Sequence, residues 1–531
     1  MRPFRIPDHR AQPPSRRRTP SPSRRVAAAG FALCLALSLG GCAAGHTAVP
    51  VGSASAEDTV RVGTTTAMMS MDFTRDSGAA IPQALMGNVY ETLITIDDDG
   101  HLAPCLASSW EVSPDELTYT FRLRPEVTFS DGSPFTSETA AFSLRRAREE
   151  WINTSARQLD VISDIATPDP HTLTITLSHR STQWLWRMTT FVGAMMAPQG
   201  IERIGTDPLG TGPYRVTFFS PGTGIHFRAR DDYWGTAPEF HEASIQFFTD
   251  AISATNALST GDLDVIWGHT NPEMLDSIDP SPKVSVGTSN GEFLLSMNNQ
   301  RAPFNDERVR KAVSYAVDRR AVLDTAWEGY GTDTGGTPVA PTDPWYDPHE
   351  YYEHNPEKAR DLLREAGYGT EANPGPEITI SVPSLPYAQA ASEVVYSQLV
   401  DVGFRVHLKK TEFPAVWLSE VHKQHDYDMS LIAHVEPRDI SRIFGDPTYY
   451  LGVNDPQLQE LFTKADRGSA DAEVPTMRTA VDRIMDHAYG ITLMNVPNIV
   501  LSRPGVGGIH PTITTDSLQL FRMTRENNED S

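Results

Sequence analysis

Cysteine is scarce in this chain, which has three cysteines in 531 residues. Cys34 and Cys42 both fall within the first 42 residues. Cys105 is therefore left without a partner, and no intrachain disulfide is available to the rest of the chain. Cys105 stands between Pro104 and Leu106, and we expect it to be a small buried apolar residue rather than a reactive thiol.

The common catalytic and metal-binding motifs are also missing. The sequence has no H-E-x-x-H zinc motif, no glycine-rich phosphate loop and no Asp-rich calcium loop. Gly287–Gly291 matches the G-x-S-x-G pattern of a nucleophile elbow, but a helix must follow that elbow, and Glu292–Met297 has the pattern of a strand. We therefore expect a protein that is not an enzyme and that has no catalytic residues, no cofactor and no protein-held metal. An extracellular hydrolase is the weaker alternative.

No apolar run in the sequence is long enough to span a membrane as a helix, which takes about 20 residues. The run Val26–Leu39 follows an arginine-rich start and fits the apolar core of a secretory signal. It ends in Leu39–Cys42, which resembles the bacterial lipobox, where the cysteine is acylated and becomes the first mature residue. We expect residues 1–41 to be a lipoprotein signal peptide, Cys42 to carry the lipid, and residues 42–58 to be a flexible tether. An ordinary signal peptide is the alternative.

Positive charge is in short supply. The chain has 45 Lys and Arg against 68 Asp and Glu, a net charge of −23. Residues 1–41 carry eight Arg and one Asp, and subtracting this +7 leaves about −30 for the remaining chain. Such an acidic surface argues against binding nucleic acid and against lying flat on an anionic membrane. About 490 residues also exceed what one hydrophobic core organises, so two or three structural units are expected.

Alternation and capping signals predict both strands and helices in the first half. Residues 60–62, 117–123 and 172–177 are predicted strands, the last two because apolar and polar residues alternate. Thr136 is expected to cap a helix with Glu138 in its first turn, where the helix dipole favours a carboxylate.

The second half has the pattern of an α/β fold. Asn305 and Asn355 are each expected to cap a helix. Residues 378–382, a helix over about 387–402, and residues 404–408 make a strand–helix–strand unit, which implies parallel strands. Mixed sheets flanked by helices, with several return crossings of the chain, predict lobes that close over a cleft.

A series of motifs in a fixed order carries a resemblance to one family. They are Asn88–Leu93, Leu106–Ser113, Leu117–Arg124, Phe129–Thr136, Leu209–Tyr214, Gly261–Asp264, Met297–Asn298, Pro303–Phe304, Arg308–Ala312, Asp318–Arg319 and Asn355–Tyr368. From about Val60 to Gly508 the chain resembles the extracellular solute-binding proteins that serve peptide, dipeptide and nickel importers of the ATP-binding-cassette (ABC) type. Within the motifs, Arg308 and Arg310 are expected to pair with acidic neighbours.

The resemblance implies an α/β fold like that of type II periplasmic binding proteins, with two lobes around a hinged cleft and an extra inserted domain. Domain Ia would comprise residues 59–94, 205–290 and 500–531, the last including the C-terminal tail. Domain Ib would comprise residues 95–204, and domain II residues 291–499.

The resemblance also implies a function. The protein would be a lipid-anchored monomer on the outer face of the cell membrane that captures a small extracellular solute by hinge closure. It would deliver that solute to ABC permease subunits, which work with cytoplasmic ATPases. A sensor that signals to a membrane receptor is a further alternative.

Two stretches are candidates for the ligand cleft. Residues 68–73 follow the opening strand and combine methionine and phenylalanine with polar groups, which gives an adaptable surface. Residues 431–439 follow a strand end, where ligands bind in α/β sheets. We predict ligand contacts from Met69, Ser70, Met71, Asp72, Phe73, His434, Glu436, Arg438 and Asp439, with Trp267 and His269 as further candidates.

The identity of the ligand stays open in the sequence. Peptide-binding relatives typically carry an Asp, which pairs with the α-amino group of the peptide, where this chain has Ala433 and His434. A di- or oligopeptide is still the leading prediction, with Glu436 or Asp439 as the substitute carboxylate. Because His434 and Arg438 favour an acidic group, another acidic solute is an alternative, and so is a chelated metal such as nickel.

A second group of residues has a spacing that one helical turn would bring together around a metal. These residues are His422, His425, Asp426 and Asp428. We favour a solvated helix end for them over a metal site.

Overall fold

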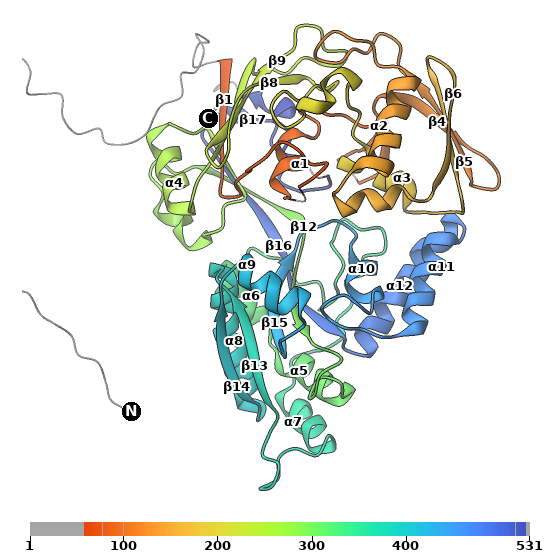
Figure 1. Ribbon diagram of the computed structural model, residues 1–531. Helices are drawn as coiled ribbons and strands as arrows, with labels where there is room; N and C mark the ends of the chain where they lie inside the picture. The colour runs from red at the N-terminus through yellow and green to blue at the C-terminus, as the bar shows by residue number, and fades with distance from the viewer. Residues whose placement is uncertain (1–57, 77, 99, 516, 527–531) are drawn as a thin grey trace, which may run out of the picture. The chain divides into compact units, whose positions relative to one another are not determined.

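A long mixed β-sheet runs through the fold. The computed structural model describes residues 58–76, 78–98, 100–515 and 517–526, all within one compact unit. In this part of the chain the sheet has ten strands in the order β14-β13-β15-β12-β16-β11-β1-β10-β9-β8 (Figure 1). Their bounds are β14 Arg405–Thr411, β13 Glu377–Pro383, β15 Met429–His434, β12 Lys283–Met297, β16 Gly490–Ser502, β11 Val265–Trp267, β1 Thr59–Thr64, β10 Glu242–Phe247, β9 Gly224–Ala229 and β8 Tyr214–Ser220.

Two long strands connect the two ends of this sheet. β12 and β16 contain 15 and 13 residues and pair in antiparallel fashion along most of their length. β12 also pairs with β15, on the side of the sheet that contains β13 and β14. β16 also pairs with β11, on the side that contains β1 and β8–β10 (Figure 1). Gly287–Gly291 lies inside β12, where the Ser289 hydroxyl donates to the carbonyl oxygen of Val496. This stretch is therefore extended strand and forms no nucleophile elbow.

The strand–helix–strand unit predicted in the second half is confirmed. β13 and β14 pair in parallel, and α8 (Pro386–Val402) connects them. Gly403 ends α8 with φ of 112°, a conformation that a residue with a Cβ rarely adopts. β15 also pairs in parallel with β13. The carboxyl ends of the three strands therefore share one edge of the sheet, and the chain leaves β15 there at His434.

A second sheet forms within the segment 95–204. Among the described residues it has four strands, β4 (Ala107–Val112), β5 (Thr118–Leu123), β7 (Thr172–Leu177) and β6 (Ile162–Asp169), in that spatial order. Helix α2 (Ser137–Glu150) starts at the predicted cap Thr136, which exchanges hydrogen bonds with Thr139. Buried side chains from these strands and from α2, such as Phe121 and Leu144, belong to one hydrophobic core. Cys105 is half-buried against this core.

Helix α5 (Glu307–Ala316) does not have the predicted cap. Its N-cap is Asp306, whose side chain accepts a hydrogen bond from the backbone N–H of Arg308. The prediction of Asn305 was wrong by one residue, because two adjacent residues of the sequence both have good capping side chains. The predicted cap Asn355 is confirmed for α7 (Pro356–Glu365), where it accepts from Lys358.

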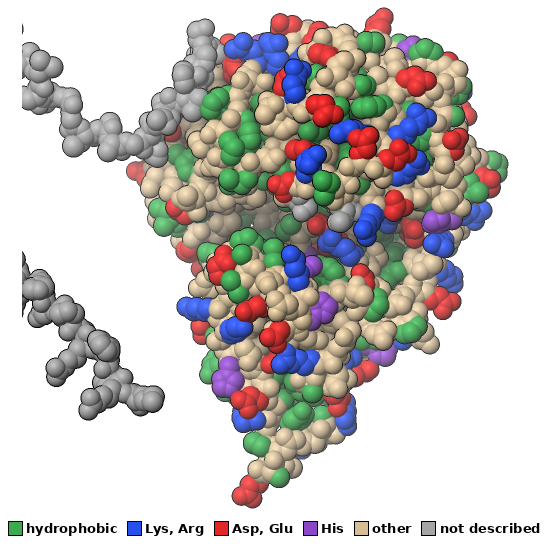
Figure 2. Space-filling model, viewed as in Figure 1, with side chains coloured by type: hydrophobic (Ala, Val, Ile, Leu, Met, Phe, Trp, Pro, Cys, Tyr) green, Lys and Arg blue, Asp and Glu red, His purple; other side chains and the backbone are tan. Residues whose placement is uncertain are grey.

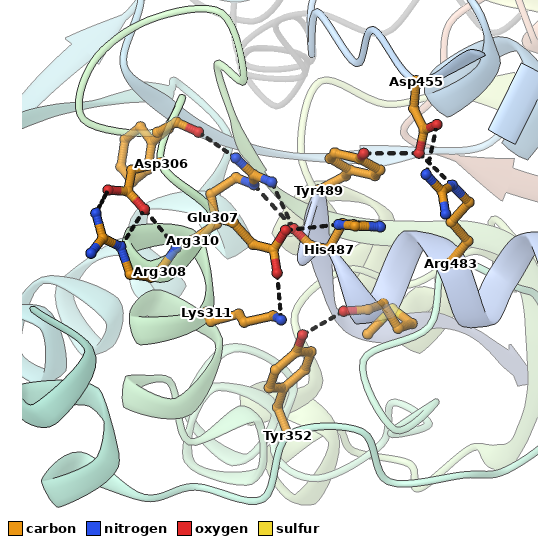
Figure 3. Close-up of polar contacts among 12 residues, drawn as sticks. Asp306, Glu307, Arg308, Arg310, Lys311, Tyr352, Asp455, Arg483, His487 and Tyr489 are labelled. Atoms are coloured by element: carbon orange, nitrogen blue, oxygen red, sulfur yellow. Dashed lines mark hydrogen bonds and ion pairs between the residues drawn. The ribbon is translucent and has the colours of Figure 1, made fainter. Parts of the chain in front are cut away.

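Arg310 on α5 is buried in a polar network that Figure 3 shows. Its guanidinium donates to the carbonyl oxygens of Phe304 and His487, and it lies 5.2 Å from the ring centroid of Tyr489. The expected pairing with a carboxylate was therefore wrong. His487 follows α12 (Ala470–Asp486), and carbonyl groups at helix C-termini lack intrahelical donors, which explains why this one accepts from an arginine. Arg308, by contrast, does pair with an acid, Asp306.

The remaining α-helices and the short strands lie outside the elements described above. The helices are α1 Ala80–Leu85, α3 Trp184–Arg187, α4 Ala251–Thr260, α6 Arg319–Trp327, α9 Ala415–Trp417, α10 Ile440–Gly445 and α11 Pro456–Arg467, and the short strands are β2 Ile94–Ile96, β3 Leu102–Pro104, β17 Val506–Gly507 and β18 Thr524–Arg525. In this part of the protein no helix has the length and apolar character needed to cross a membrane. The predicted signal peptide, the predicted lipidation site Cys42 and nearly all of the predicted tether lie outside the described residues.

Candidate functional site

A cavity of about 190 Å³ lies where the loop after β15 faces residues of the segment 95–204. Helices α3, α10, α11 and α12 contribute to its wall, and Figure 2 shows the surface hollowed between these elements. Its lining residues are Gln158, Gln183, Trp186, Arg187, Trp345, Glu436, Pro437, Arg438, Asp439, Ser441, Arg442, Phe462, Ala465, Asp466 and Met477. Three of the predicted ligand contacts, Glu436, Arg438 and Asp439, are among them.

Direct hydrogen bonds join the two sides of this cavity. The Ser181 hydroxyl donates to the Asp466 carboxylate over 2.6 Å, and the backbone N–H of Thr182 donates to the Asp466 carbonyl oxygen over 2.8 Å. The Gln183 amide donates to the Glu473 carboxylate. The residues just before α3 are thus attached to α11 and α12, so the two segments are in contact beside the cavity.

Arg438 also bridges the two sides. Its guanidinium carbon lies 4.4 Å from the ring centroid of Trp186 and 5.0 Å from that of Trp345, and its Nε lies 3.3 Å from the Asp343 carboxylate. The backbone at Arg438 has φ of 55°, which is uncommon for a residue with a side chain. Burial raises the pKa of Asp343 to about 6, although Arg438 opposes the shift. Arg438 is therefore already engaged with both a carboxylate and two aromatic rings.

Acidic groups outnumber basic ones in the loop after β15. Arg442 lies 2.7 Å from the Glu436 carboxylate and 3.2 Å from that of Asp439, so two acids share one arginine. Burial raises the pKa of Asp439 to about 7, with Arg442 lowering it and the Glu436 charge raising it further. Asp439 therefore changes its charge near neutral pH.

Two donors that line the cavity have no partner within the described part of the protein. The Arg187 guanidinium lines the wall and makes neither a hydrogen bond nor an ion pair there. The indole Nε1 of Trp345, a side chain that is 2% exposed, has no acceptor. An arginine fork and an indole N–H are both suited to binding a carboxylate. The cavity thus offers one positively charged donor and one neutral donor without partners, together with an acid whose pKa is raised to about 7.

His434 ends β15 beside this cavity but does not carry a positive charge. Its Nε2 lies 2.9 Å from the Tyr450 hydroxyl. The imidazole and the Tyr450 ring stack, with 5.8 Å between their centroids. Burial lowers the pKa of His434 to about 3, and the Arg442 charge adds to this effect. A neutral imidazole cannot attract an acidic ligand group by charge, so His434 does not have the electrostatic role that the sequence suggested.

The predicted contacts from residues 68–73 lie elsewhere. Met71 and Phe73 are fully buried in the core around β1 and α1, where Phe73 contacts Tyr90, while Met69 is 65% exposed. Asp72 accepts hydrogen bonds from the backbone N–H and the hydroxyl of Thr74. Ser70 is half-buried. The structure does not bring these residues to the cavity that holds residues 436–439.

Trp267 and His269 are also apart from that cavity. They are 5% and 2% exposed, and Trp267 lines a different hollow of about 210 Å³ with residues 508–515. The His269 Nε2 lies 2.9 Å from the Asn271 carbonyl oxygen. Both residues therefore remain candidates without a link to residues 434–439.

The possible metal-binding group near His422 is not assembled. Asp426 and Asp428 both pair with Arg301, at 3.0 and 3.1 Å. The His422 ring packs against Tyr449. Among the described residues, no group of three or more His, Cys, Asp or Glu side chains is arranged to hold a metal ion.

Sequence reasoning missed four residues that shape the cavity, namely Trp186, Arg187, Asp343 and Trp345. The run Trp184–Arg187 places two tryptophans beside an arginine, which is a signal for a binding surface. Trp184 is fully buried, however, so composition alone does not separate the core residue from the lining residue. Asp343 and Trp345 stand in a long connection without periodicity, and nothing local marks them.

Comparison with known proteins places the chain in a family. Residues 101–444 match the bacterial extracellular solute-binding proteins, family 5, in the middle region of that family. The chain belongs to this family. Its members are solute-binding proteins, so the resemblance drawn from the sequence motifs is confirmed.

Named relatives differ in what they bind. The chain is 26% identical over 471 residues to the nickel-binding periplasmic protein of Escherichia coli, covering 79% of this chain and 86% of that protein. It is 28% identical over 302 residues to the glutathione-binding protein GsiB of Salmonella paratyphi A, covering 55% and 58%. The family membership thus establishes a solute-binding component of an ABC importer and leaves the solute open.

A solved structure supports the fold class. The periplasmic binding protein DppA of Helicobacter pylori, solved in complex with the peptide STSA, superposes with a TM-score of 0.73 at 20% identity. The match covers 88% of this chain and 98% of DppA. The predicted α/β fold of type II periplasmic binding proteins is therefore confirmed.

Proposed function

We propose that this protein captures a small solute with both a positive and a negative group, most simply a di- or oligopeptide, and delivers it to an ABC permease. The two segments that border the cavity close on the solute by a hinge motion, and the permease recognises the closed form. The protein acts as a binding protein rather than as an enzyme, and it works as a monomer.

The observation that carries this proposal is the unpaired Arg187 guanidinium in a cavity that also contains the titrating acid Asp439. A peptide presents a carboxylate to the first group and an amino group to the acids. Trp186 and Trp345 supply apolar walls, which suits side chains of varied size. Glutathione, the ligand in the name of one relative, also carries a free amino group and carboxylates.

Hinge closure is supported by the sheet topology. Domain Ib (95–204) has its own sheet and core, and domain II (291–499) meets it at the cavity through the Ser181–Asp466 and Gln183–Glu473 bonds. We assign the residues 59–94, 205–290 and 500–531 to domain Ia. β12 and β16 connect domain Ia to domain II, and strands that cross between lobes are suitable hinges because few backbone angles must change.

A chelated metal such as nickel is the second candidate. The nickel-binding relative aligns over 79% of this chain. The His434 Nδ1 has no hydrogen-bond partner among the described residues, and a neutral imidazole nitrogen is a good ligand for nickel. A nickel ion held by an organic chelator would take one nitrogen from the protein, so no cluster of protein ligands is needed.

The location of the protein is part of the proposal. We assign it to the outer face of the cell membrane, held by acyl chains on Cys42, with residues 42–58 as the tether. The support is the lipobox-like stretch Leu39–Cys42 after a secretory signal.

Native mass spectrometry of the purified full-length protein tests the function. We expect a co-purified solute whose mass fits a short peptide, and release of that solute on denaturation. Titration calorimetry with di-, tri- and tetra-alanine and with a nickel–histidine chelate then separates the two candidates. A protein that carries no solute and binds none of these probes would contradict both.

A further inference from the structure

The carboxyl group of Glu292 is buried with one oxygen unused. Glu292 stands in β12 and is 8% exposed. Its Oε1 accepts a hydrogen bond from the Asn495 amide over 2.8 Å, whereas its Oε2 has no partner among the described residues. Burying a carboxyl oxygen without a hydrogen-bond donor lowers the free energy of unfolding, so ordinary packing does not explain a glutamate at this position.

Glu292 lies on the side of the sheet that faces the cavity. It pairs directly with His434 of β15, and residues opposite each other in an antiparallel pair point to the same face. The next residues on this face, Leu294 and Ile432, pack in one core cluster with Trp345. Trp345 lines the cavity. Glu292 therefore lies on the strand next to β15, opposite the residue from which the loop 435–439 starts, and on the same face of the sheet as Leu294 and Ile432.

No basic side chain of the described chain is available to Glu292. The charged groups that act on it are the acids Asp343 and Asp439, whose own ion-pair partners are Arg438 and Arg442. Burial raises the pKa of Glu292 well above its usual range, and the charges of Asp343 and Asp439 raise it further. The Glu292 carboxyl group therefore has no positively charged partner within the described part of the protein.

We propose that Glu292 is the residue that recognises a positively charged group of the ligand, with its Oε2 accepting a hydrogen bond from a protonated amine or guanidinium. This inference rests on the proposed function, because it assigns one end of the bound solute. It would also supply a carboxylate for an amino group in a chain that has Ala433 and His434 where the resemblance implies the Asp of peptide-binding relatives. The opposite, acidic end of the solute would lie toward Arg187.

The test uses Glu292→Gln in the full-length protein, purified in detergent. Glutamine keeps one oxygen to accept the bond from Asn495, but it replaces Oε2 with an uncharged NH2 group that cannot accept a hydrogen bond from the ligand. The probes are di-, tri- and tetra-alanine, and for the tightest binder also its N-acetylated form and its C-terminal amide, all measured by titration calorimetry. For the wild type we expect the N-acetylated probe to bind at least about tenfold more weakly than the free peptide, as when one partner of a buried charge pair is lost. For Glu292→Gln we expect the free peptide and its N-acetylated form to bind with similar affinity.

Glu91→Gln is the matched control. Glu91 is 7% exposed, but its carboxylate accepts bonds from Thr211, Tyr233 and Trp234, so it has no unused oxygen, and the charged group that acts on it is Arg230. The affinities of Glu91→Gln for the free and the N-acetylated peptide are expected to equal those of the wild type. Circular dichroism and the melting temperature check the fold, and Glu292→Gln is expected to melt at or above the wild-type temperature because a buried acid is removed.

Three outcomes would overturn the inference. If the wild type binds the alanine peptides and Glu292→Gln keeps the preference for the free amine, Glu292 has no such role and the proposed function stands. If the wild type binds free and N-acetylated peptide equally, no positive group is recognised. If the wild type binds no peptide, the peptide function fails and the role of Glu292 fails with it.

Discussion

The guanidinium carbon of Arg438 lies 4.4 Å from the ring centroid of Trp186, although 251 positions separate the two residues in the chain. Arg438 follows the carboxyl end of β15, and Trp186 belongs to α3 in the segment 95–204. The contact therefore joins the two sides of the cavity. Because the same guanidinium also pairs with Asp343, it is held in place against the tryptophan, as the proposed hinge closure requires.

Replacing Trp186 with alanine is expected to weaken closure. A cation–π contact contributes about 0.5 to 2 kcal/mol, so the affinity for the tightest alanine peptide should fall by about 2- to 30-fold. Calorimetry measures the affinity, and small-angle X-ray scattering should show a larger radius of gyration without ligand. Trp110→Ala is the control, since Trp110 is half-buried on β4 and does not line the cavity. Equal affinity and equal radius for Trp186→Ala and the wild type would contradict the closure contact.

Arg187→Gln tests the negative end of the solute. The wild type is expected to prefer the free peptide over its C-terminal amide, because a carboxylate pairs with the guanidinium and an amide does not. In the variant, the affinity for the free peptide should fall about tenfold or more while that for the amide stays within about twofold. Arg203→Gln serves as the control, since Arg203 lies outside the cavity and pairs with Asp207. Loss of affinity for both probes by the same factor would point to a structural role for Arg187.

Much of the fold could be predicted from the sequence because its signals are local. Alternation over a few residues, a cap such as Thr136 and a glycine such as Gly403 each fix one element without reference to distant residues. Adjacent capping residues are less decisive, and the choice between Asn305 and Asp306 depended on which side chain reached the first turn.

The candidate site was only partly predictable, because it depends on segments that meet in three dimensions. Residues 436–439 were found since they follow a strand end, but their partners Trp186 and Asp343 come from other parts of the chain. Glu292 was recognised in the sequence only as part of a strand. Its unused oxygen follows from what surrounds it, which no local pattern describes.

Asp439 makes stability depend on pH in a defined direction. Its folded-state pKa of about 7 lies above the usual value of 3.8. Between about pH 4 and pH 7 the folded protein keeps a proton that the unfolded chain has released, so rising pH destabilises the fold across this window. Relative to Asp439→Asn, the wild type should lose about 1 to 3 kcal/mol of unfolding free energy between pH 5 and pH 8.

Urea unfolding at the two pH values measures this difference. His434, whose pKa is lowered to about 3, shifts stability in the opposite direction, but it is present in both proteins and cancels in the comparison. An equal change for the variant and the wild type would show that Asp439 titrates normally in the folded protein.

Cys42→Ala tests the proposed membrane attachment. A cysteine that carries two or more acyl chains holds a protein stably on a bilayer, whereas a protein without them leaves it. In fractionated cells we expect the wild type in the membrane fraction with incorporated radioactive palmitate, and the variant in the soluble fraction without label. Cys105→Ala is the matched control, because Cys105 lies half-buried against the core of the segment 95–204. This variant should incorporate the label and stay in the membrane fraction. Retention of Cys42→Ala in the membrane would rule out the lipid on Cys42 as the anchor and would require a different attachment.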